Sequence, residues 1–277
     1  MNAPPLAGAT MTDWSSPHDV EHSDDEVNPF TMLLPREEEE EEEELQESVS
    51  LQHQRYNLQS IHSTILIRQL PSQGLSFQLW PAAATLVNLL DTRRQVHPTL
   101  SALFARQEAG YRLRILELGS GTGVTGIAAA AILGARVTVT DLPHVLPNIQ
   151  FNVDLNSEVL QKRGGAVEAA ALSWGETEDM EAVGREYDLI LGSDVVYHDH
   201  LYEPLLKTLR FFLLGRGERE RKTAFVMAHL RRWKKESGFF KKAKKVFDVE
   251  IVHTDPPLDG SRIGVAVYLF VPKFGLS

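Results

Sequence analysis

Three glycines stand at alternate positions directly after an apolar segment, in the run Ile115-Leu116-Glu117-Leu118-Gly119-Ser120-Gly121-Thr122-Gly123. Glycine permits positive φ values and lets a ligand approach the backbone closely. An alanine-rich stretch follows over residues 124–133. The first N–H groups of a helix have no partner within the helix, so they are free to face a ligand. The order of strand, turn and helix therefore predicts a site for a nucleotide-like cofactor.

Two acidic residues flank this turn. Glu117 stands two residues before Gly119, at a position that is usually apolar in dinucleotide-binding folds. Asp141 ends the next apolar segment, 20 residues after Gly121, where a carboxylate can accept hydrogen bonds from both ribose hydroxyls. The overlapping pattern Gly121-x-Gly123-x-x-Gly126 also fits a dinucleotide site. Asp141 thus predicts a nucleoside, and Glu117 favours S-adenosylmethionine (SAM) over NAD.

A second polar motif, Asp194-Val195-Val196-Tyr197, follows the buried segment at residues 187–192. Open α/β sheets bind ligands outside the carboxyl ends of their strands. A carboxylate and a phenol at this place would therefore lie at the mouth of the cleft. Alone, the motif is explained equally well by Asp194 capping a turn and Tyr197 packing. Together with the glycine loop, it favours a reactive site.

The elements that position these residues alternate along the chain. Strands are expected at residues 112–118, 136–140, 167–172, 187–192, 223–228, 247–253 and 264–271. Helices are expected at residues 81–90, 124–133, 143–156, 201–214 and 233–245. Such alternation predicts an α/β fold with helices on both faces of a mostly parallel sheet. No helix separates the last two strands, so we expect them to form an antiparallel pair at one edge.

The N-terminal part of the chain has a different character. Residues 1–50 carry a formal charge of −14, including eight consecutive glutamates from Glu37 to Glu44, whereas residues 51–277 carry +4. Such a segment cannot bury enough apolar surface to offset its chain entropy, so we expect residues 1–50 to be a disordered acidic extension. Alternation over Tyr56–Arg68 indicates one arm of a β-hairpin, and Leu75–Leu79 suggests another short strand.

These motifs together resemble a known family. The Glu-Leu-Gly-Ser-Gly-Thr-Gly loop, Asp141, the segment Leu172-Ser173-Trp174-Gly175 and Asp194-Val195-Val196-Tyr197 look like those of the seven-β-strand protein-lysine methyltransferases. The closest resemblance is to the methyltransferase-like 21 group, and it covers roughly residues 55–272. It implies a Rossmann-like SAM-dependent methyltransferase fold for residues 51–277, with a seven-stranded sheet and an N-terminal β-hairpin.

The resemblance also implies roles for single residues. Trp80, Trp174 and Ser193 match family positions that contact SAM, and the residues Glu117, Gly119, Ser120, Gly121 and Asp141 complete the expected cofactor site. Asp194 and Tyr197 are the expected catalytic residues. We expect Asp194 to dock and orient the acceptor amine rather than to act as a strong base, because a nearby carboxylate stabilises the ammonium form.

The expected partner is a protein with an accessible lysine; chaperones and translation factors are the family's usual substrates. Asp194-Val195-Val196-Tyr197 lacks the two prolines typical of enzymes that methylate planar nitrogens, which disfavours a nucleic-acid substrate. A methyltransferase of small molecules or nucleic acids, and a catalytically silent SAM-binding module, stay open as alternatives.

The basic stretch from Arg231 to Lys245 is expected to be a solvated helix face; binding of an acidic partner or of Glu37–Glu44 is the alternative. His198 and His200 lack further ligands, so no metal site is expected. The chain has no cysteine, no apolar run long enough for a membrane span and no secretory signal, which favours the cytoplasm, with the nucleus as a second compartment.

Overall fold

The computed structural model describes residues 53–93, 97–214, 223–232, 236–257 and 263–273. Its centre is a seven-stranded sheet in the order β5-β4-β3-β6-β7-β9-β8. The strands are β3 (Arg114–Leu118), β4 (Arg136–Asp141), β5 (Ala166–Ala171), β6 (Leu189–Ser193), β7 (Ala224–Leu230), β8 (Phe247–Thr254) and β9 (Val265–Pro272). Strands β3 to β7 pair in parallel, while β9 is antiparallel to both β7 and β8. The predicted sheet, including its antiparallel edge, is confirmed.

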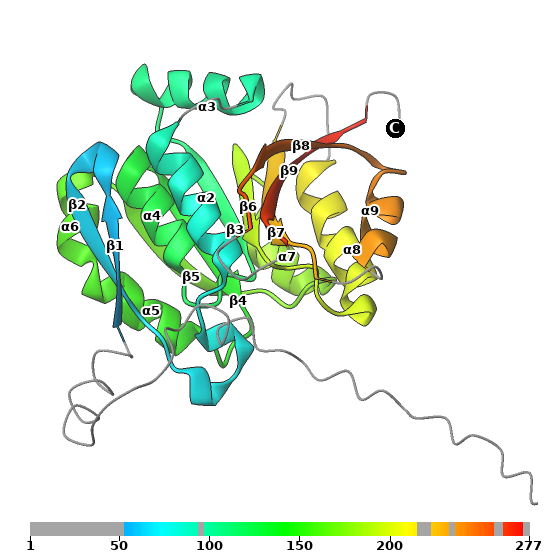
Figure 1. Cartoon of the computed structure of the whole chain (residues 1–277), viewed down its shortest axis with the longest axis horizontal. Coiled ribbons are helices and arrows are strands. Elements are labelled where there is room, and N and C mark those ends of the chain that lie inside the picture. The colour runs from blue at the N-terminus through cyan, green and yellow to red at the C-terminus, as the bar shows by residue number, and fades with distance from the viewer. Residues whose placement is uncertain (1–52, 94–96, 215–222, 233–235, 258–262, 274–277) are drawn as a thin grey trace, which may run out of the picture. The chain divides into compact units, whose positions relative to one another are not determined.

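Helices cover both faces of the sheet, with α2, α4 and α5 on one side and α7, α8 and α9 on the other (Figure 1). The helices are α2 (Pro81–Thr92), α3 (Pro98–Glu108), α4 (Val124–Leu133), α5 (Leu146–Leu155), α6 (Ser157–Arg163), α7 (Thr177–Val183), α8 (Tyr202–Leu213) and α9 (Ser237–Ala243). The chain enters β3, returns through α4 to β4, and later reaches β6 on the other side of β3. The strand order therefore reverses between β3 and β6, which is where such sheets bind ligands.

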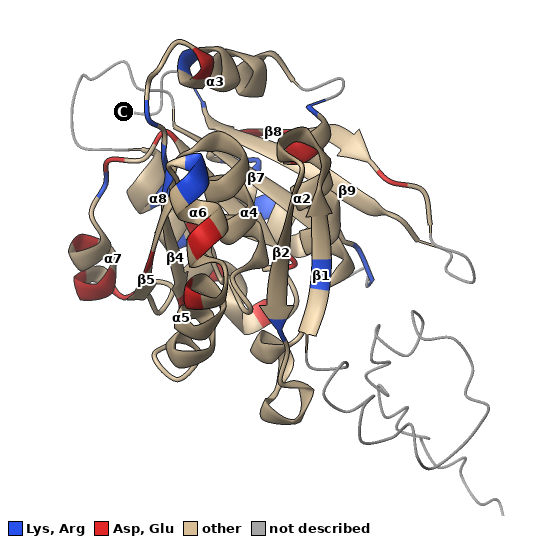
Figure 2. Cartoon of the chain, turned by 90° about the vertical axis from the view of Figure 1, so that its left-hand side faces the viewer, with Lys and Arg blue, Asp and Glu red and all other residues tan. Residues whose placement is uncertain are grey.

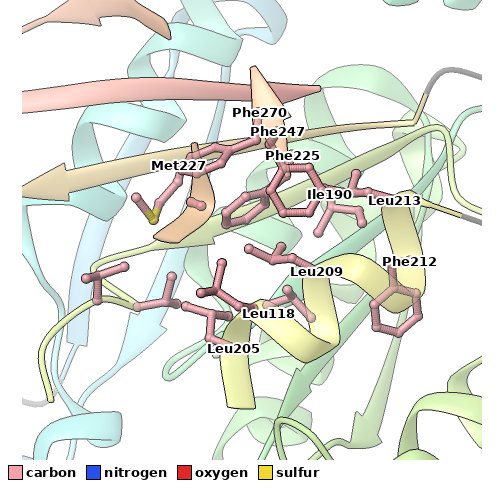
Figure 3. Close-up of a cluster of buried hydrophobic side chains, with 14 of the residues drawn as sticks. Leu118, Ile190, Leu205, Leu209, Phe212, Leu213, Phe225, Met227, Phe247 and Phe270 are labelled. Atoms are coloured by element: carbon pink, nitrogen blue, oxygen red, sulfur yellow. The ribbon is translucent and has the colours of Figure 1, made fainter. Parts of the chain in front are cut away.

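The apolar face of α8 fixes that helix against the sheet. Leu205, Leu209 and Leu213 recur at a spacing of four and are buried. They belong to one buried cluster with side chains of β3, β6 and β7 (Figure 3), in which the ring centroid of Phe225 lies 5.2 Å from that of Phe270 in β9. Apolar burial contributes about 25 cal/mol per Å². This cluster therefore holds the carboxyl end of β6, and the motif that follows it, in a fixed place.

A β-hairpin of β1 (His53–Leu58) and β2 (Ser63–Arg68) lies beside α4, α5 and α6 (Figure 1). Ile65 and Ile67 of β2 are fully buried, as the alternation predicted. Two asparagine side chains accept hydrogen bonds from the free edge of β2. Asn152, in α5, accepts from the Arg68 N–H at 2.8 Å, and Asn156, directly after α5, accepts from the Leu66 N–H at 2.9 Å. The hairpin thereby fixes the helix that follows β4.

Four short 3-10 helices complete the described part: η1 (Gln59–Ile61), η2 (Pro71–Gln73), η3 (Leu75–Phe77) and η4 (Asp199–Leu201). The strand predicted at Leu75–Leu79 is wrong, because the segment has no strand beside it and its backbone closes local turns instead, with Phe77 N–H donating to Gly74 O at 3.1 Å.

Several helix bounds also differ from prediction. Helix α5 begins at Leu146 and not at residue 143, because a turn from Leu142 to Val145 precedes it. Helix α9 begins at Ser237 and ends at Ala243, so Lys244 and Lys245 lie beyond it, and residues 233–235 lie outside the described residues. The helices α6 and α7 were not predicted.

Helix α7 carries acidic residues in its first turn and is partly red in Figure 2: Glu178 is exposed, whereas Asp179 is half-buried and accepts from the Ser173 N–H at 2.9 Å. Among the described helices, none is both long and apolar enough to cross a bilayer. The acidic residues 1–50, with their predicted disorder and their possible contact with basic residues, lie outside the described residues.

Candidate active site

The turn between β3 and α4 presents backbone where side chains would otherwise stand. Gly119 has a φ of +60°, and a Cβ atom there would lie 2.9 Å from Cζ2 of Trp174. A Cβ on Gly121, whose φ is +56°, would lie 3.1 Å from the carbonyl oxygen of Ser76 in η3. Only glycine fits both the backbone angle and the space at these two positions. The indole of Trp174 and the η3 segment therefore lie directly against the loop.

Asp141 and Ser120 tie this loop to the end of β4. The Asp141 carboxylate accepts from the Gly121 N–H and from the Leu142 N–H, each at 2.8 Å. Burial raises the pKa of Asp141, although these two donors oppose the rise. The Ser120 hydroxyl instead accepts from the Thr140 N–H at 3.0 Å. Ser120 thus serves the loop's attachment to β4, while Asp141 keeps lone pairs for further donors.

Glu117 is fully buried beneath the start of α4. Its Oε2 accepts from the Gly126 N–H at 2.9 Å, whereas Oε1 has no hydrogen-bond partner among the described residues. Burial raises the pKa of Glu117 to about 7, and the donors around it only partly offset that effect. A buried carboxylate oxygen without a donor is costly, so Oε1 of Glu117 is a candidate position for binding a donor or a cation of a ligand.

Asp194 follows β6 directly and has a φ of +52°. Its Oδ1 accepts from the Leu230 N–H at 2.9 Å, and its Oδ2 accepts from Nη2 of Arg232 at 3.1 Å. Burial alone would raise the pKa of Asp194, but the contact with His229 and the charge of Arg232 together hold it below its usual value. Asp194 is therefore a carboxylate at neutral pH, and it is bound to the end of β7.

Tyr197 is half-buried three residues after Asp194. Burial raises the pKa of Tyr197, and the negative charge of Asp141 adds to the rise. The phenol therefore stays protonated at neutral pH, and it is near enough to Asp141 to feel its charge. Ser193 is the last residue of β6 and pairs with Ala228 of β7. Ser193 and the motif Asp194–Tyr197 therefore follow one another at the carboxyl end of β6.

Trp80 precedes α2 and is only partly buried. Its indole N–H donates to the Leu75 carbonyl at 3.0 Å, which fixes the ring beside η3. The guanidinium of Arg232 lies over the ring, 5.1 Å from its centroid. The structure thereby connects Trp80, through Arg232, to Asp194.

Three further residues of the site, His229, Arg232 and Glu236, were not predicted from the sequence. His229 Nε2 lies 3.1 Å from Oε2 of Glu236, and both side chains are fully buried. The available signal was their place in the chain, because the strand next to β6 has a histidine at its penultimate position and two arginines directly after it. Arg232 points inward, although it is followed closely by lysines that are typical of a solvated face.

The residues of the loop fit SAM. Glu117 offers an unpartnered carboxylate oxygen for a cation or donor, Asp141 offers free lone pairs at the end of β4, and Gly119 brings the loop backbone close to the indole of Trp174, which can form an apolar wall of a cofactor pocket. SAM carries an ammonium group, a sulfonium and two ribose hydroxyls, and each of these groups is stabilised by a carboxylate.

The sheet order with an antiparallel edge, together with a glycine loop after its first parallel strand, defines the Rossmann-like methyltransferase class. A SAM-dependent methyltransferase from Agrobacterium tumefaciens has the same fold, with a TM-score of 0.50, 18% identity and coverage of 80% of this chain and 71% of that one.

A family model described as lysine methyltransferase matches residues 59–246. This chain belongs to the lysine methyltransferase family.

Curated relatives agree with this assignment. The protein N-lysine methyltransferase METTL21A of Danio rerio is 38% identical over 146 residues, covering 53% of this chain and 62% of the relative. The protein-lysine methyltransferase METTL21E of Mus musculus is 33% identical over 184 residues, covering 65% and 67%. EEF1A lysine methyltransferase 3 of Mus musculus is 33% identical over 184 residues, covering 66% and 68%. The chain thus spans about two thirds of the length of these relatives.

Proposed function

We propose that this chain transfers a methyl group from SAM to the ε-amine of a lysine in a protein substrate. The observation that carries the proposal is the meeting of the glycine loop with the motif after β6: a Cβ atom on Gly119 would lie 3.1 Å from Cγ1 of Val195, the residue that follows Asp194. Membership of the lysine methyltransferase family supports the same activity.

On the cofactor side, Glu117 and Asp141 would bind the polar groups of SAM, and the loop from Gly119 to Gly121 would pass along it. Trp174 supports that role, because its ring lies against Gly119 and forms an apolar wall there. Trp80 and Ser193 would contact SAM from the start of α2 and the end of β6. The Ser120 side chain would act indirectly, since its hydroxyl holds the loop to Thr140.

When bound, SAM supplies a methyl group on a positively charged sulfur; transfer to a neutral amine forms one N–C bond, breaks one S–C bond and leaves S-adenosylhomocysteine and a proton. Free lysine has a pKa of about 10.4, so most of it arrives as ammonium. Asp194, a carboxylate at neutral pH, would attract and orient that cation. Tyr197, protonated at neutral pH, would hold the nitrogen in line through its hydroxyl. Alignment of two reactants is worth about 7–11 kcal/mol, so no strong base is required.

A translation factor is the substrate class that the relatives favour. Two of them, from Xenopus tropicalis and Mus musculus, are named EEF1A lysine methyltransferase 3. EEF1A is therefore the first protein to test, and a cell lysate provides the wider search.

The experiment incubates the full chain with methyl-labelled SAM and either EEF1A or a cell lysate, followed by mass spectrometry of the labelled lysines. Asp194→Asn and Tyr197→Phe should each lower methyl transfer at least tenfold, with S-adenosylhomocysteine binding within about threefold of wild type by calorimetry, because removing one aligned contact costs about 1.4 kcal/mol or more. Asp199→Ala is the matched control, since Asp199 lies two residues after Tyr197, is exposed, and its carboxylate accepts from the N–H of its neighbour His200.

Label on nucleic acid or on a small molecule in place of protein lysine would refute the proposed acceptor. Loss of S-adenosylhomocysteine binding in both variants would refute their placement on the acceptor side.

A further inference from the structure

Four charged side chains form one cluster where β6 and β7 end. Asp194, His229, Arg232 and Glu236 are joined in a chain: His229 Nδ1 lies 3.4 Å from Oδ1 of Asp194, and its Nε2 lies 3.1 Å from Oε2 of Glu236. Arg232 Nη2 lies 3.1 Å from Oδ2 of Asp194. The side chains of His229 and Glu236 are fully buried, and that of Arg232 is 15% exposed.

The carboxylate of Asp194 has basic partners without any substrate. Burial lowers the pKa of His229, but its contacts with Asp194 and Glu236 outweigh that effect and raise it overall. Asp194 therefore already has two basic neighbours, the guanidinium of Arg232 and the imidazole of His229. A lysine ammonium that approached Asp194 would meet the positive charge of Arg232, and like charges at close range repel strongly in a buried site. Arg232 or His229 must therefore leave Asp194 for a lysine to bind there.

Arg232 is the resident cation that can leave. It holds Asp194 through one nitrogen only, and its Nε is buried without a hydrogen-bond partner among the described residues. Paired carboxylates and guanidinium groups are more stable when two parallel bonds form, so this contact is a weak version of the pair. His229 in contrast is fully enclosed: its Nε2 lies 3.1 Å from Oε2 of Glu236, and its Nδ1, which has no hydrogen-bond partner among the described residues, faces Oδ1 of Asp194 at 3.4 Å.

The position of Arg232 is also the position that an acceptor lysine needs. Its guanidinium lies between Oδ2 of Asp194, on the proposed acceptor side, and the ring of Trp80, on the proposed cofactor side. A carboxylate and an aromatic face are together a favourable site for an alkylammonium ion. The two contacts hold a cation of the protein where a cation of the substrate would be held.

We propose that Arg232 occupies the acceptor site of the free protein, and that the substrate lysine replaces it against Asp194 and Trp80. The inference rests on the proposed function and makes Arg232 a specificity-determining residue. A neutral acceptor cannot compensate Asp194 when Arg232 leaves, whereas an ammonium ion can. The exchange thus selects cationic side chains before any chemistry takes place.

The test measures binding of n-butylammonium chloride, a probe of the lysine side chain, to the full chain saturated with S-adenosylhomocysteine. We expect Arg232→Gln to bind the probe at least tenfold more tightly than wild type, because the competing cation is gone. Arg232→Lys keeps a cation and should bind it as weakly as wild type. Arg231→Gln is the matched control, since Arg231 is the exposed neighbour. The neutral probe n-butanol should show no difference between the variants.

A second measurement needs no variant at Arg232. The buried Nε–H of Arg232 in wild type should exchange faster with water, by nitrogen-15 NMR, when n-butylammonium is added and not when n-butanol is added. Equal or weaker binding by Arg232→Gln, or an Nε–H that is unaffected at saturating probe, would overturn the exchange. Neither readout depends on methyl transfer. The labelling experiment can therefore refute the proposed function while the probe still replaces Arg232, and the probe can fail to replace Arg232 while methyl transfer to lysine is observed.

Discussion

Replacing Glu117 by glutamine tests whether the chain keeps a costly carboxyl group for its ligand. Glu117 is fully buried, one of its oxygens has no partner among the described residues, and burial raises its pKa from 4.5 to about 7. Glutamine has the same shape and can still accept from the Gly126 N–H. Its amide group can donate to the Thr125 hydroxyl, which is also buried without a partner in the described part.

The sign of the pH dependence follows from which state holds the proton. Between pH 4.5 and about 7, Glu117 is protonated in the folded chain and ionised in the unfolded chain. The folded chain thus binds more protons, so its stability falls as the pH rises through this window. The pKa difference corresponds to about 3 kcal/mol, all of it lost above pH 7. Glutamine is neutral at every pH, so Glu117→Gln should avoid that loss.

The assay is urea unfolding of the cofactor-free chain at pH 5 and pH 8. We expect the stability of Glu117→Gln relative to wild type to increase by about 2.5 kcal/mol between these two pH values, because at pH 5 the unfolded carboxyl is already mostly ionised and all other groups cancel in the comparison. Glu158→Gln, on the exposed face of α6, is the control and should stay within about 0.5 kcal/mol at both. A constant difference between Glu117→Gln and wild type would refute the reasoning.

The same variant should bind S-adenosylhomocysteine about tenfold more weakly at pH 8, where the carboxylate is available to the ligand's ammonium group. Gain of stability and loss of affinity in one substitution would show that the buried charge serves binding. A variant that is more stable and binds equally well would instead make Glu117 a packing residue.

Three further predictions concern the frame of the site. Asp141→Asn should weaken S-adenosylhomocysteine binding about tenfold by calorimetry, since its charge strengthens each accepted hydrogen bond; unchanged affinity would contradict its ribose role. Gly119→Ala should lower the free energy of unfolding in urea by about 3 kcal/mol, because alanine would have a positive φ and would clash with the indole ring of Trp174. The control Gly164→Ala should lower it by about 1 kcal/mol, because Gly164 has a positive φ but open space around it. Equal losses would exclude the clash. Asn152→Ala should lower the free energy of unfolding by about 3 kcal/mol, because it leaves three backbone groups unpaired. The exposed control Asn57→Ala should lower it by less than about 0.5 kcal/mol. Similar losses in the two variants would mean that β2 is held by packing alone.

The parts of the fold that were predictable are those whose cause is local in sequence. The alternation of strand and helix segments along the chain predicted a mostly parallel sheet. The glycines after β3 predicted a turn before α4, irrespective of the rest of the chain. The edge pair β8 and β9 was predictable because too few residues separate them for a crossover helix. Each of these follows from chain geometry over fewer than 30 residues, in which short-range physics decides.

The parts that escaped prediction depend on contacts between distant segments. Asn152 and Asn156 pair the edge of β2 from 84 and 90 residues away, and nothing in the local pattern says which backbone they meet. Their spacing of four indicates one helix face, but amides on a helix face are usually solvated. The strand prediction at Leu75–Leu79 was wrong for the same reason. Whether an apolar run becomes a strand depends on a neighbouring strand edge, and here the run forms η3 (Leu75–Phe77), which lies against the glycine loop.

Asp194 illustrates why a motif can be found by sequence while its role needs the structure. The backbone at Asp194 is left-handed, a conformation that aspartate and asparagine tolerate better than most residues. Its N–H donates to Ala228 and its carboxylate accepts from Leu230, so the short side chain closes the end of β6 onto β7. A glutamate would be too long to make this closure at the same backbone position. Asparagine keeps both the backbone preference and the acceptor oxygen but removes the charge that faces Arg232. Loss of activity in Asp194→Asn therefore isolates the charge from the scaffold, which alanine, lacking the acceptor as well, cannot do.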